Sequence, residues 1–331
     1  CRSSLDLVRL LLDRGADMEA RDYNGGTPLH TTVLWNYVDI SELLLSRGAD
    51  MEARNDNGLT PLFWASRSSR EVVRLLLDRG ASMEARDQSG GTLLHMAVLR
   101  NYFDITELLL SRGADMEARN DETDTPLHVA CCEGHLDLIR LLLSQGAVLE
   151  TLNSNGGTPL HTAAGEQEDL AVVQLLLSRG ANLEARDFDG HAPLHLTSMK
   201  NSHKVAELLM NQGANLEARN NNGRTPLHLA GDLEAARLLL DRGASLEPRD
   251  KKGKTPLHMA CSEGNIQVAR LLLDQSADLE AKDNMGCRSL HFAARNNCCR
   301  VARLLLDRRA LVDATTLART TPLSLACQAG H

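Results

Sequence analysis

Apolar residues recur along the chain in two short blocks separated by polar stretches. The first block follows a proline and places leucine and valine at helical spacing, as in residues 28–34. The second block places Ile40, Leu43 and Leu44 three and four residues apart, which is typical of one face of a helix. Gly48 then marks a helix end, and a polar segment with turn residues follows over residues 50–58. The pattern predicts a pair of short helices joined to the next pair by a hairpin-like loop.

This pattern returns about every 33 residues from one end of the chain to the other. One such pair of helices cannot bury its own apolar face, so successive copies must stack into a solenoid. We expect residues 1–331 to form a single α-helical repeat solenoid with partial repeats at 1–21 and 316–331. The expected full repeats are 22–54, 55–86, 87–119, 120–152, 153–186, 187–219, 220–249, 250–282 and 283–315.

The repeated motifs resemble those of the ankyrin-repeat family. Thr-Pro-Leu-His begins at Thr27, Thr125, Thr158, Thr225 and Thr255, and altered copies occupy the remaining repeats. A Leu-Leu-Leu-x-x-Gly-Ala stretch accompanies it in most copies, for example at residues 10–16 and 43–49. The resemblance covers the whole chain and implies paired antiparallel helices joined by β-hairpin-type loops. It also implies a protein-interaction module that binds another protein and does not catalyse a reaction.

The composition of the chain indicates which classes of partner and which cellular compartment to expect. The chain has a net charge of −8, which argues against a general nucleic-acid binder, because such proteins need a basic face. Aromatic residues make up only 3%, so the core must be thin and aliphatic. No apolar run is long enough to insert into a membrane. The eight cysteines show no C-x-x-C pair, which favours a reducing, intracellular compartment. We expect a monomer.

The histidines do not form a metal or catalytic site in this pattern. Eight of the twelve are the fourth residue of the Thr-Pro-Leu-His motif or its variants, so they lie a repeat apart. The family resemblance implies that each bonds its own threonine and the backbone of the neighbouring repeat. The sequence contains no H-E-x-x-H, phosphate-binding loop or nucleophile elbow. We therefore expect no cofactor, no metal and no enzyme active site within these residues.

A regular series of charges runs through the loops. Acidic residues occupy one position, and basic residues follow two positions later, at Glu19, Glu52, Glu84, Glu117, Glu150, Glu184, Glu217, Glu247, Glu280 and Asp313, and at Arg21, Arg54, Arg86, Arg119, Arg186, Arg219, Arg249 and Lys282. Because residues i and i+2 of an extended segment point the same way, we expect parallel acidic and basic rows that pair with each other. The alternative is a row of arginines offered to an acidic partner.

In ankyrin proteins, partners usually contact variable residues at the loop tips and at the exposed ends of the first helices. Tyr23 and Trp35 form the best apolar anchor, since tryptophan and tyrosine often dominate interfaces. The further candidates at these positions are Arg100, Phe188, Lys200, Lys251, Lys252 and Lys254. Each has a simpler interpretation: Trp35 could cover a neighbouring helix, and the lysines of residues 251–254 could be an ordinary solvated loop.

Several departures from the repeat affect stability and boundaries. Repeat 220–249 lacks about one helical turn, which should shorten its first helix. Ser276 and Arg309 replace the glycine that ends the second helix, at a cost in backbone energy. We expect residues 250–315 to be less stable than residues 22–219. Both chain ends leave apolar residues such as Leu11 and Leu323 without a neighbour, which suggests a fragment of a larger protein. The alternative function is a regulatory or targeting arm of an enzyme or channel whose active part lies outside this segment.

Overall fold

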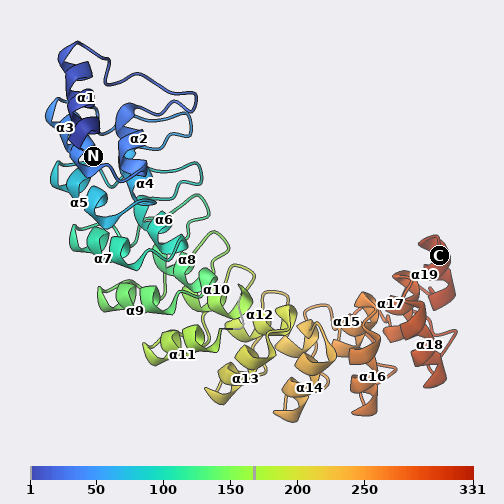
Figure 1. Cartoon of the computed structure of the whole chain (residues 1–331). Helices are drawn as coiled ribbons and strands as arrows, with labels where there is room; N and C mark the ends of the chain where they lie inside the picture. Colours follow the sequence, from blue (N-terminus) through green and yellow to red (C-terminus); the bar gives the residue numbers. More distant parts are fainter. Residues whose placement is uncertain (1, 167–168) are drawn as a thin grey trace. The chain divides into compact units, whose positions relative to one another are not determined.

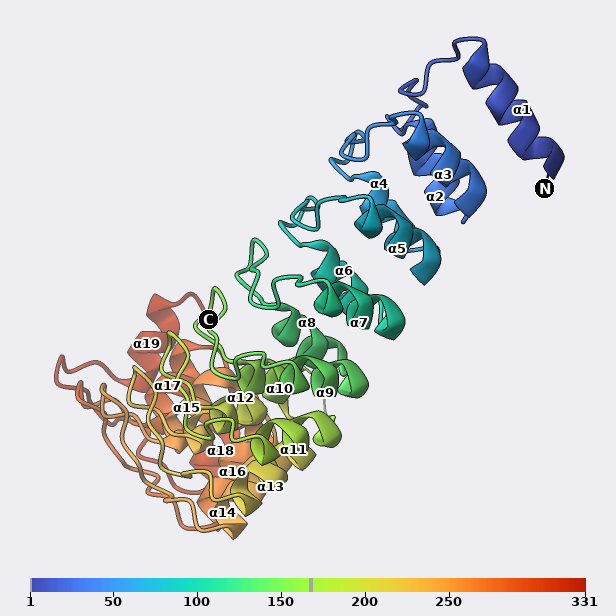
Figure 2. The ribbon, with the colours of Figure 1, turned by 90° about the vertical axis from the view of Figure 1, so that its left-hand side faces the viewer.

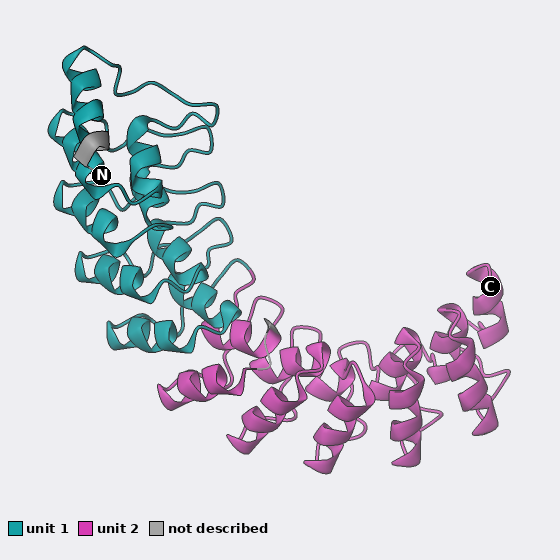
Figure 3. Ribbon diagram, viewed as in Figure 1, with its two compact units in different colours: residues 1–154 teal, residues 155–331 magenta. Residues whose placement is uncertain are grey.

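The first helix of each repeat begins at the proline of the repeated motif, where a missing backbone N–H costs no hydrogen bond. Thr27, with extended backbone, precedes Pro28 in this arrangement, and Thr125 precedes Pro126 in the same way. The computed structural model describes residues 2–166 and 169–331; Cys1 and residues 167–168, within the expected repeat 153–186, lie outside them. The chain divides into two compact units, residues 1–154 and 155–331 (Figure 3).

Unit 1, residues 1–154, consists of two layers of stacked helices with loops projecting from one side (Figure 1). The first helices of successive repeats form one layer: α2 (Pro28–Leu34), α4 (Pro61–Ala65), α6 (Leu93–Leu99) and α8 (Pro126–Glu133). The second helices form the other layer: α1 (Arg2–Asp13), α3 (Val38–Ser46), α5 (Arg70–Asp78), α7 (Phe103–Ser111) and α9 (Leu136–Ser144). Each second helix packs on the second helix of the next repeat.

Unit 2, residues 155–331, repeats this arrangement, and its loops extend together to one side of the helices (Figure 2). The first-helix layer contains α10 (Pro159–Glu166), α12 (Pro193–Lys200), η1 (Pro226–Leu229), α15 (Pro256–Glu263), α17 (Ser289–Arg295) and α19 (Pro322–Gln328). The second-helix layer contains α11 (Leu170–Ser178), α13 (His203–Asn211), α14 (Leu233–Asp241), α16 (Ile266–Asp274) and α18 (Cys299–Asp307). Among the described residues, the only β pairing is the isolated bridge between Arg86 and Thr92.

The core lies between the two layers and is aliphatic, as the shortage of aromatic residues predicted. Leu29 and Val33 of α2 are completely buried, and so are Val72, Val73 and Leu76 of α5. Small residues fill the remaining space between repeats, including Ala65, Ala97, Ala130, Ala164 and Ala236. Every repeat contributes the same few positions, so burial is spread along the stack and no single centre forms.

Left-handed backbone ends the helices where the sequence predicts it. The turns after the first helices use Asn36 (φ 57°), Asn101 (φ 57°) and Gly134 (φ 72°). Ser276 (φ 72°) and Arg309 (φ 68°) hold the left-handed conformation that glycine adopts at the same position in other repeats. The shortened repeat 220–249 has only the four-residue 3-10 helix η1 in place of its first α-helix. These three local predictions are confirmed.

Two further observations concern the surface. No helix among the described residues has the length and apolarity that a membrane crossing requires. Leu11 of α1 and Leu323 of α19 expose 51% and 72% of their surface.

Candidate protein-binding surface

The repeated histidines connect each loop to the next repeat. In the first full repeat, the backbone N–H of Thr27 donates to Nδ1 of His30 at 3.1 Å. That contact leaves the ring proton on Nε2, which lies 3.0 Å from the carbonyl oxygen of Leu59, 29 residues later. In unit 2 the Nε2 atoms of His195 and His228 lie 3.1 and 3.0 Å from carbonyl oxygens of the following repeat. The family-based expectation of a bond to the neighbouring repeat is confirmed for these three histidines, whereas Nε2 of His258 lies 3.0 Å from the carbonyl oxygen of Ala281 in its own repeat. These contacts assign the histidines a structural role.

Burial also keeps these histidines neutral. It lowers the pKa of His195 and His258 to about 4, against the ordinary value of 6.5, and the bonds to backbone carbonyls oppose the shift only in part. Burial lowers the pKa of His30, His95 and His228 as well. A neutral imidazole matches the bonding described above, since Nδ1 must accept a hydrogen bond.

The glutamates of the acidic row that are named below bond backbone N–H groups of the next repeat and not the basic row, so the expected pairing of the two rows was wrong for them. The carboxylate of Glu52 accepts a hydrogen bond from the backbone N–H of Ser82 at 2.7 Å, one repeat on. Glu217 accepts from the N–H of Ser245 at 2.6 Å. The same inter-repeat bond occurs at Glu19, Glu117, Glu184, Glu247 and Glu280. The carboxylates therefore satisfy backbone donors that the loops leave without a partner.

The basic row satisfies backbone acceptors in the same way. Arg219 donates from Nη1 to the carbonyl oxygen of Gly223 at 2.9 Å and to that of Arg249 at 2.6 Å. Comparable inter-repeat bonds come from Arg21, Arg86, Arg119, Arg186 and Arg249. A charge at either position is thus explained by the backbone it bonds. Nη1 of each of these arginines is engaged within the stack, and the alternative of an arginine row offered to an acidic partner remains a prediction.

Backbone bonds between neighbouring loop tips hold the loops in register. The N–H of Asp121 donates to the carbonyl of Ser89 at 2.9 Å in unit 1. In unit 2, the N–H of Lys251 donates to the carbonyl of Asn222, and the N–H of Asn284 to that of Lys252, both at 2.9 Å. Fixed loops present their tip side chains without a large entropic cost of ordering. We call the surface formed by the loop tips and the first-helix layer of each unit its loop face.

The predicted partner-binding residues lie at different places. Tyr23 is 92% exposed in the first loop of unit 1, and Trp35 is 64% exposed at the end of α2, so most of the surface of both side chains is open to solvent. Arg100 occupies the corresponding exposed helix end in a later repeat. Phe188, 65% exposed, and Lys200, also exposed, belong to unit 2. Of these candidates, only Lys251, Lys252 and Lys254 lie together in one loop.

Lys254 differs from its two neighbours. Lys251 and Lys252 are exposed at the loop tip, whereas Lys254 is half-buried and its Nζ lies 4.5 Å from the ring centroid of Phe292. The sequence did not single out Phe292. It could be found only by comparing the fifth and tenth residues of adjacent repeats, because these meet across the stack.

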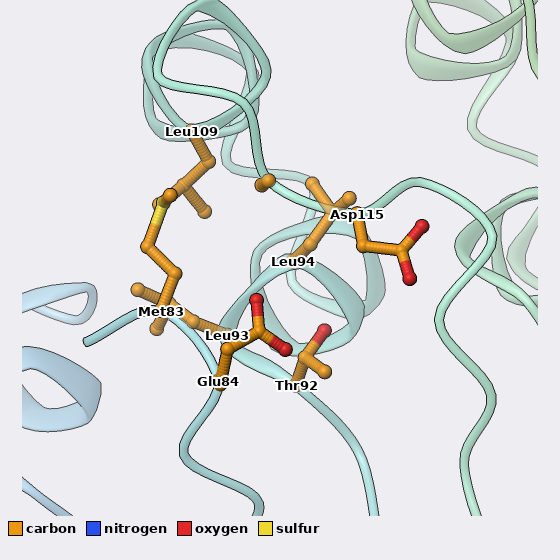
Figure 4. Close-up of a pocket in the computed structure, with 8 residues that line it drawn as sticks. Met83, Glu84, Thr92, Leu93, Leu94, Leu109 and Asp115 are labelled. Atoms are coloured by element: carbon orange, nitrogen blue, oxygen red, sulfur yellow. The ribbon is translucent and has the colours of Figure 1, made fainter.

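A small cavity lies within unit 1. The cavity shown in Figure 4 lies among Met83, Leu93, Leu94, Leu109 and the chain around Asp115 and has a volume of about 10 Å³. That space suits about one water molecule. Within the described residues, no group of three or more histidine, cysteine, aspartate or glutamate side chains is placed to hold a metal ion.

Comparison with known proteins agrees with the repeat geometry. A family model for ankyrin repeats in three copies matches residues 1–55, 47–120, 94–187, 167–250 and 231–316. The crystal structure of the ankyrin repeat domain of Bcl-3, a member of the IkappaB protein family, is similar with a TM-score of 0.59 and 32% sequence identity. That similarity covers 66% of this chain and 99% of the Bcl-3 chain. No curated protein sequence matches the chain. From the family match and the stacked helix pairs together, the chain belongs to the ankyrin-repeat family.

Proposed function

We propose that this chain is a non-catalytic protein-interaction module that presents its loop faces to another protein. The observation that carries the proposal is the contrast between the fixed backbone of the loops and the side chains at their tips. Tyr23 and Phe188 expose most of their surface while the loop backbones are bonded to their neighbours. Rigid exposed aromatic residues are frequent anchors of protein interfaces.

Ankyrin repeats bind other proteins, and the fold is typically non-catalytic. Fold alone does not name the partner. Within a longer polypeptide, the same loop faces would serve as a regulatory or targeting arm of an enzyme or channel. The exposed charges and aromatic residues of the tips would then recognise the substrate or the anchoring protein.

Affinity capture from a lysate of the cells that make the protein tests the proposal. The parent chain is compared with Tyr23→Ala/Trp35→Ala and with Lys251→Glu/Lys252→Glu/Lys254→Glu. We expect the parent to retain specific proteins, and at least one variant to lose them while its circular dichroism and melting temperature stay unchanged. If the folded parent retains no specific protein, the proposal of a binding module fails.

We also propose that the protein works inside the cell, in a reducing compartment. Burial raises the pKa of Cys261 to about 12 and that of Cys131 beyond the usual range, so both thiols stay protonated. Cys287, Cys299 and Cys327 are also free, and Cys299 and Cys327 are exposed. Thiol labelling of freshly lysed cells should find these cysteines reduced; extensive disulfide formation there would contradict this compartment.

A further inference from the structure

The fifth residue of each repeat lies beside the first helices on the loop face, and its charge differs between the units. In unit 1 this position holds Gly26, Leu59, Gly91 and Asp124. In unit 2 three successive repeats hold His191, Arg224 and Lys254. The exposed Lys251 and Lys252 add two cations at the adjacent loop tip. A local basic surface therefore exists in unit 2 although the chain as a whole is acidic.

The carboxylate of Asp250, next to this surface, is already hydrogen-bonded within the stack. Asp250 exposes only 2% of its side chain and accepts backbone hydrogen bonds from Lys252 and Lys254, both at 2.8 Å. Its other oxygen lies 3.6 Å from Nε of Arg224. Burial lowers the pKa of Lys254, the carboxylates of Asp250 and Asp283 oppose that shift, and the cations of Arg224 and Lys252 lower the pKa further. Two cations and two carboxylates therefore act on the lysine, and the exposed Lys251 and Lys252 supply the cations at the loop tip.

An apolar pocket adjoins this basic surface. It has a volume of about 180 Å³ and lies between the last two loops and the helices α17 and α19. Its lining includes Met285, Cys287, Phe292, Arg295, Thr320 and Leu325. Lys254 lies over the ring of Phe292, which lines the pocket, and Arg295, another lining residue, is exposed. This volume is below that of a pocket for a drug-sized ligand or cofactor and suits one apolar side chain.

We propose that the loop face over residues 250–325 binds an extended acidic segment of a partner protein. One apolar side chain of that segment occupies the pocket beside Phe292, and its carboxylates contact Lys251, Lys252, Lys254 and Arg295. This inference rests on the proposed function and names the surface and the chemistry of the partner. The combination of cations with an apolar pocket favours an acidic peptide, because a phosphate backbone would leave the pocket empty.

Fluorescence anisotropy with synthetic probes tests the charge and the pocket separately. The first probe is a labelled ten-residue peptide of glutamate and glycine with one central phenylalanine, and a second probe has glycine in place of phenylalanine. A labelled single-stranded oligothymidylate represents nucleic acid. We expect the parent chain 1–331 to bind the phenylalanine peptide at least threefold more tightly than the glycine peptide and the oligonucleotide. Equal or tighter binding of the oligonucleotide would overturn the proposal in favour of nucleic acid.

Charge reversal locates the binding. Lys251→Glu/Lys252→Glu should weaken the binding of the phenylalanine peptide about tenfold, since each variant residue replaces an attraction by a repulsion. Arg295→Glu should weaken it as well. The matched control is Lys204→Glu/Arg237→Glu, in the second-helix layer, which makes the same change of net charge away from residues 250–325. An equal loss with the control variant would overturn the placement of the site.

Cys287 provides an independent readout, because it is a thiol in the pocket lining. Its alkylation at alkaline pH, monitored by mass spectrometry, should be at least threefold slower when the phenylalanine peptide is saturating. The exposed thiols of Cys299 and Cys327 serve as internal references and should react at unchanged rates. If the peptide binds without protecting Cys287, or if no peptide binds, this inference fails. The proposed function would still stand where lysate capture by the parent chain succeeds, and would fail where that capture fails too.

Discussion

At the residue scale, the same side chains recur because each one forms a hydrogen bond with a backbone N–H or carbonyl group that stacking leaves without a partner. Nδ1 of a motif histidine accepts the N–H of its threonine, and its Nε2 donates to a carbonyl of the next repeat. The motif is therefore a hydrogen-bonding unit. The family resemblance already implied this role from the sequence. The sequence could not show what the loop carboxylates bond, because a glutamate two residues before an arginine looks like half of an ion pair until the backbone donors are placed.

The neutral histidines predict a loss of stability in mild acid. The pKa of His195 and His258 is about 4 in the folded chain, against 6.5 unfolded, so the unfolded chain binds more protons below pH 6.5. The free energy of unfolding should fall by about 1.4 kcal/mol per pH unit for each such histidine between pH 6.5 and 4. Urea unfolding at pH 7, 6 and 5 measures this fall. His258→Gln should reduce the pH slope, and a slope equal to that of the parent would contradict the prediction.

The left-handed backbone at Ser276 (φ 72°) predicts a gain from glycine. Ser276→Gly should raise the free energy of unfolding by about 1 kcal/mol, because a side chain is disfavoured in this conformation. The reverse change, Gly243→Ser, is the matched control: the backbone there has φ 91°, and an added Cβ would meet open space. It should destabilise by a similar amount. Denaturant titrations compare the three chains, and a neutral or destabilising Ser276→Gly would show that the backbone strain is absent.

At the scale of elements, the inter-repeat bonds decide how the loops are held. Arg219 joins its own loop to the following repeat through two carbonyl oxygens, while the helices of the second layer meet through exposed ion pairs such as Arg242 with Glu207 at 3.0 Å. Bonds from a charged donor to backbone contribute more to stability than exposed ion pairs do. The loops are therefore the firmer connection between polar groups of neighbouring repeats.

Substitution of these arginines should separate the two kinds of contact. Arg219→Ala should lower the free energy of unfolding by about 1.5–3 kcal/mol, because two carbonyl acceptors lose a charged donor. Arg237→Ala, at an exposed position of α14, should change it by less than about 0.5 kcal/mol. Chemical denaturation of both variants provides the comparison. Equal effects would mean that the inter-repeat bonds of the arginine row contribute little.

At the scale of the whole molecule, the period alone predicted the repeat solenoid, because ten copies of one sequence pattern must fold into ten similar helix pairs. The shortened first helix of repeat 220–249 and the left-handed Ser276 and Arg309 were also predictable, because each is a local departure from that period. The apolar pocket beside Phe292 was not predictable. It forms from residues of different repeats whose side chains meet only after stacking.

The same departures predict uneven stability along the chain. Residues 250–315 contain the two second helices that end in a left-handed residue other than glycine, Ser276 and Arg309, and they follow η1, which replaces a full helix. Amide hydrogen exchange should therefore be faster in 250–315 than in residues 22–219, helix by helix. Exchange that is faster in 22–219 would contradict this order. Restoring glycine at residues 276 and 309 together should slow exchange in 250–315.

The most direct test of a protein-binding loop face is amide hydrogen exchange of the chain with and without a protein captured from lysate. The proposed function predicts slower exchange on complex formation at loop tips and first helices, and the further inference places that protection at the loops around Lys251 and Met285 and at α17. The second-helix layer, including α13, α14 and α16, should exchange unchanged. Protection confined to the second-helix layer would contradict the loop face as the binding surface.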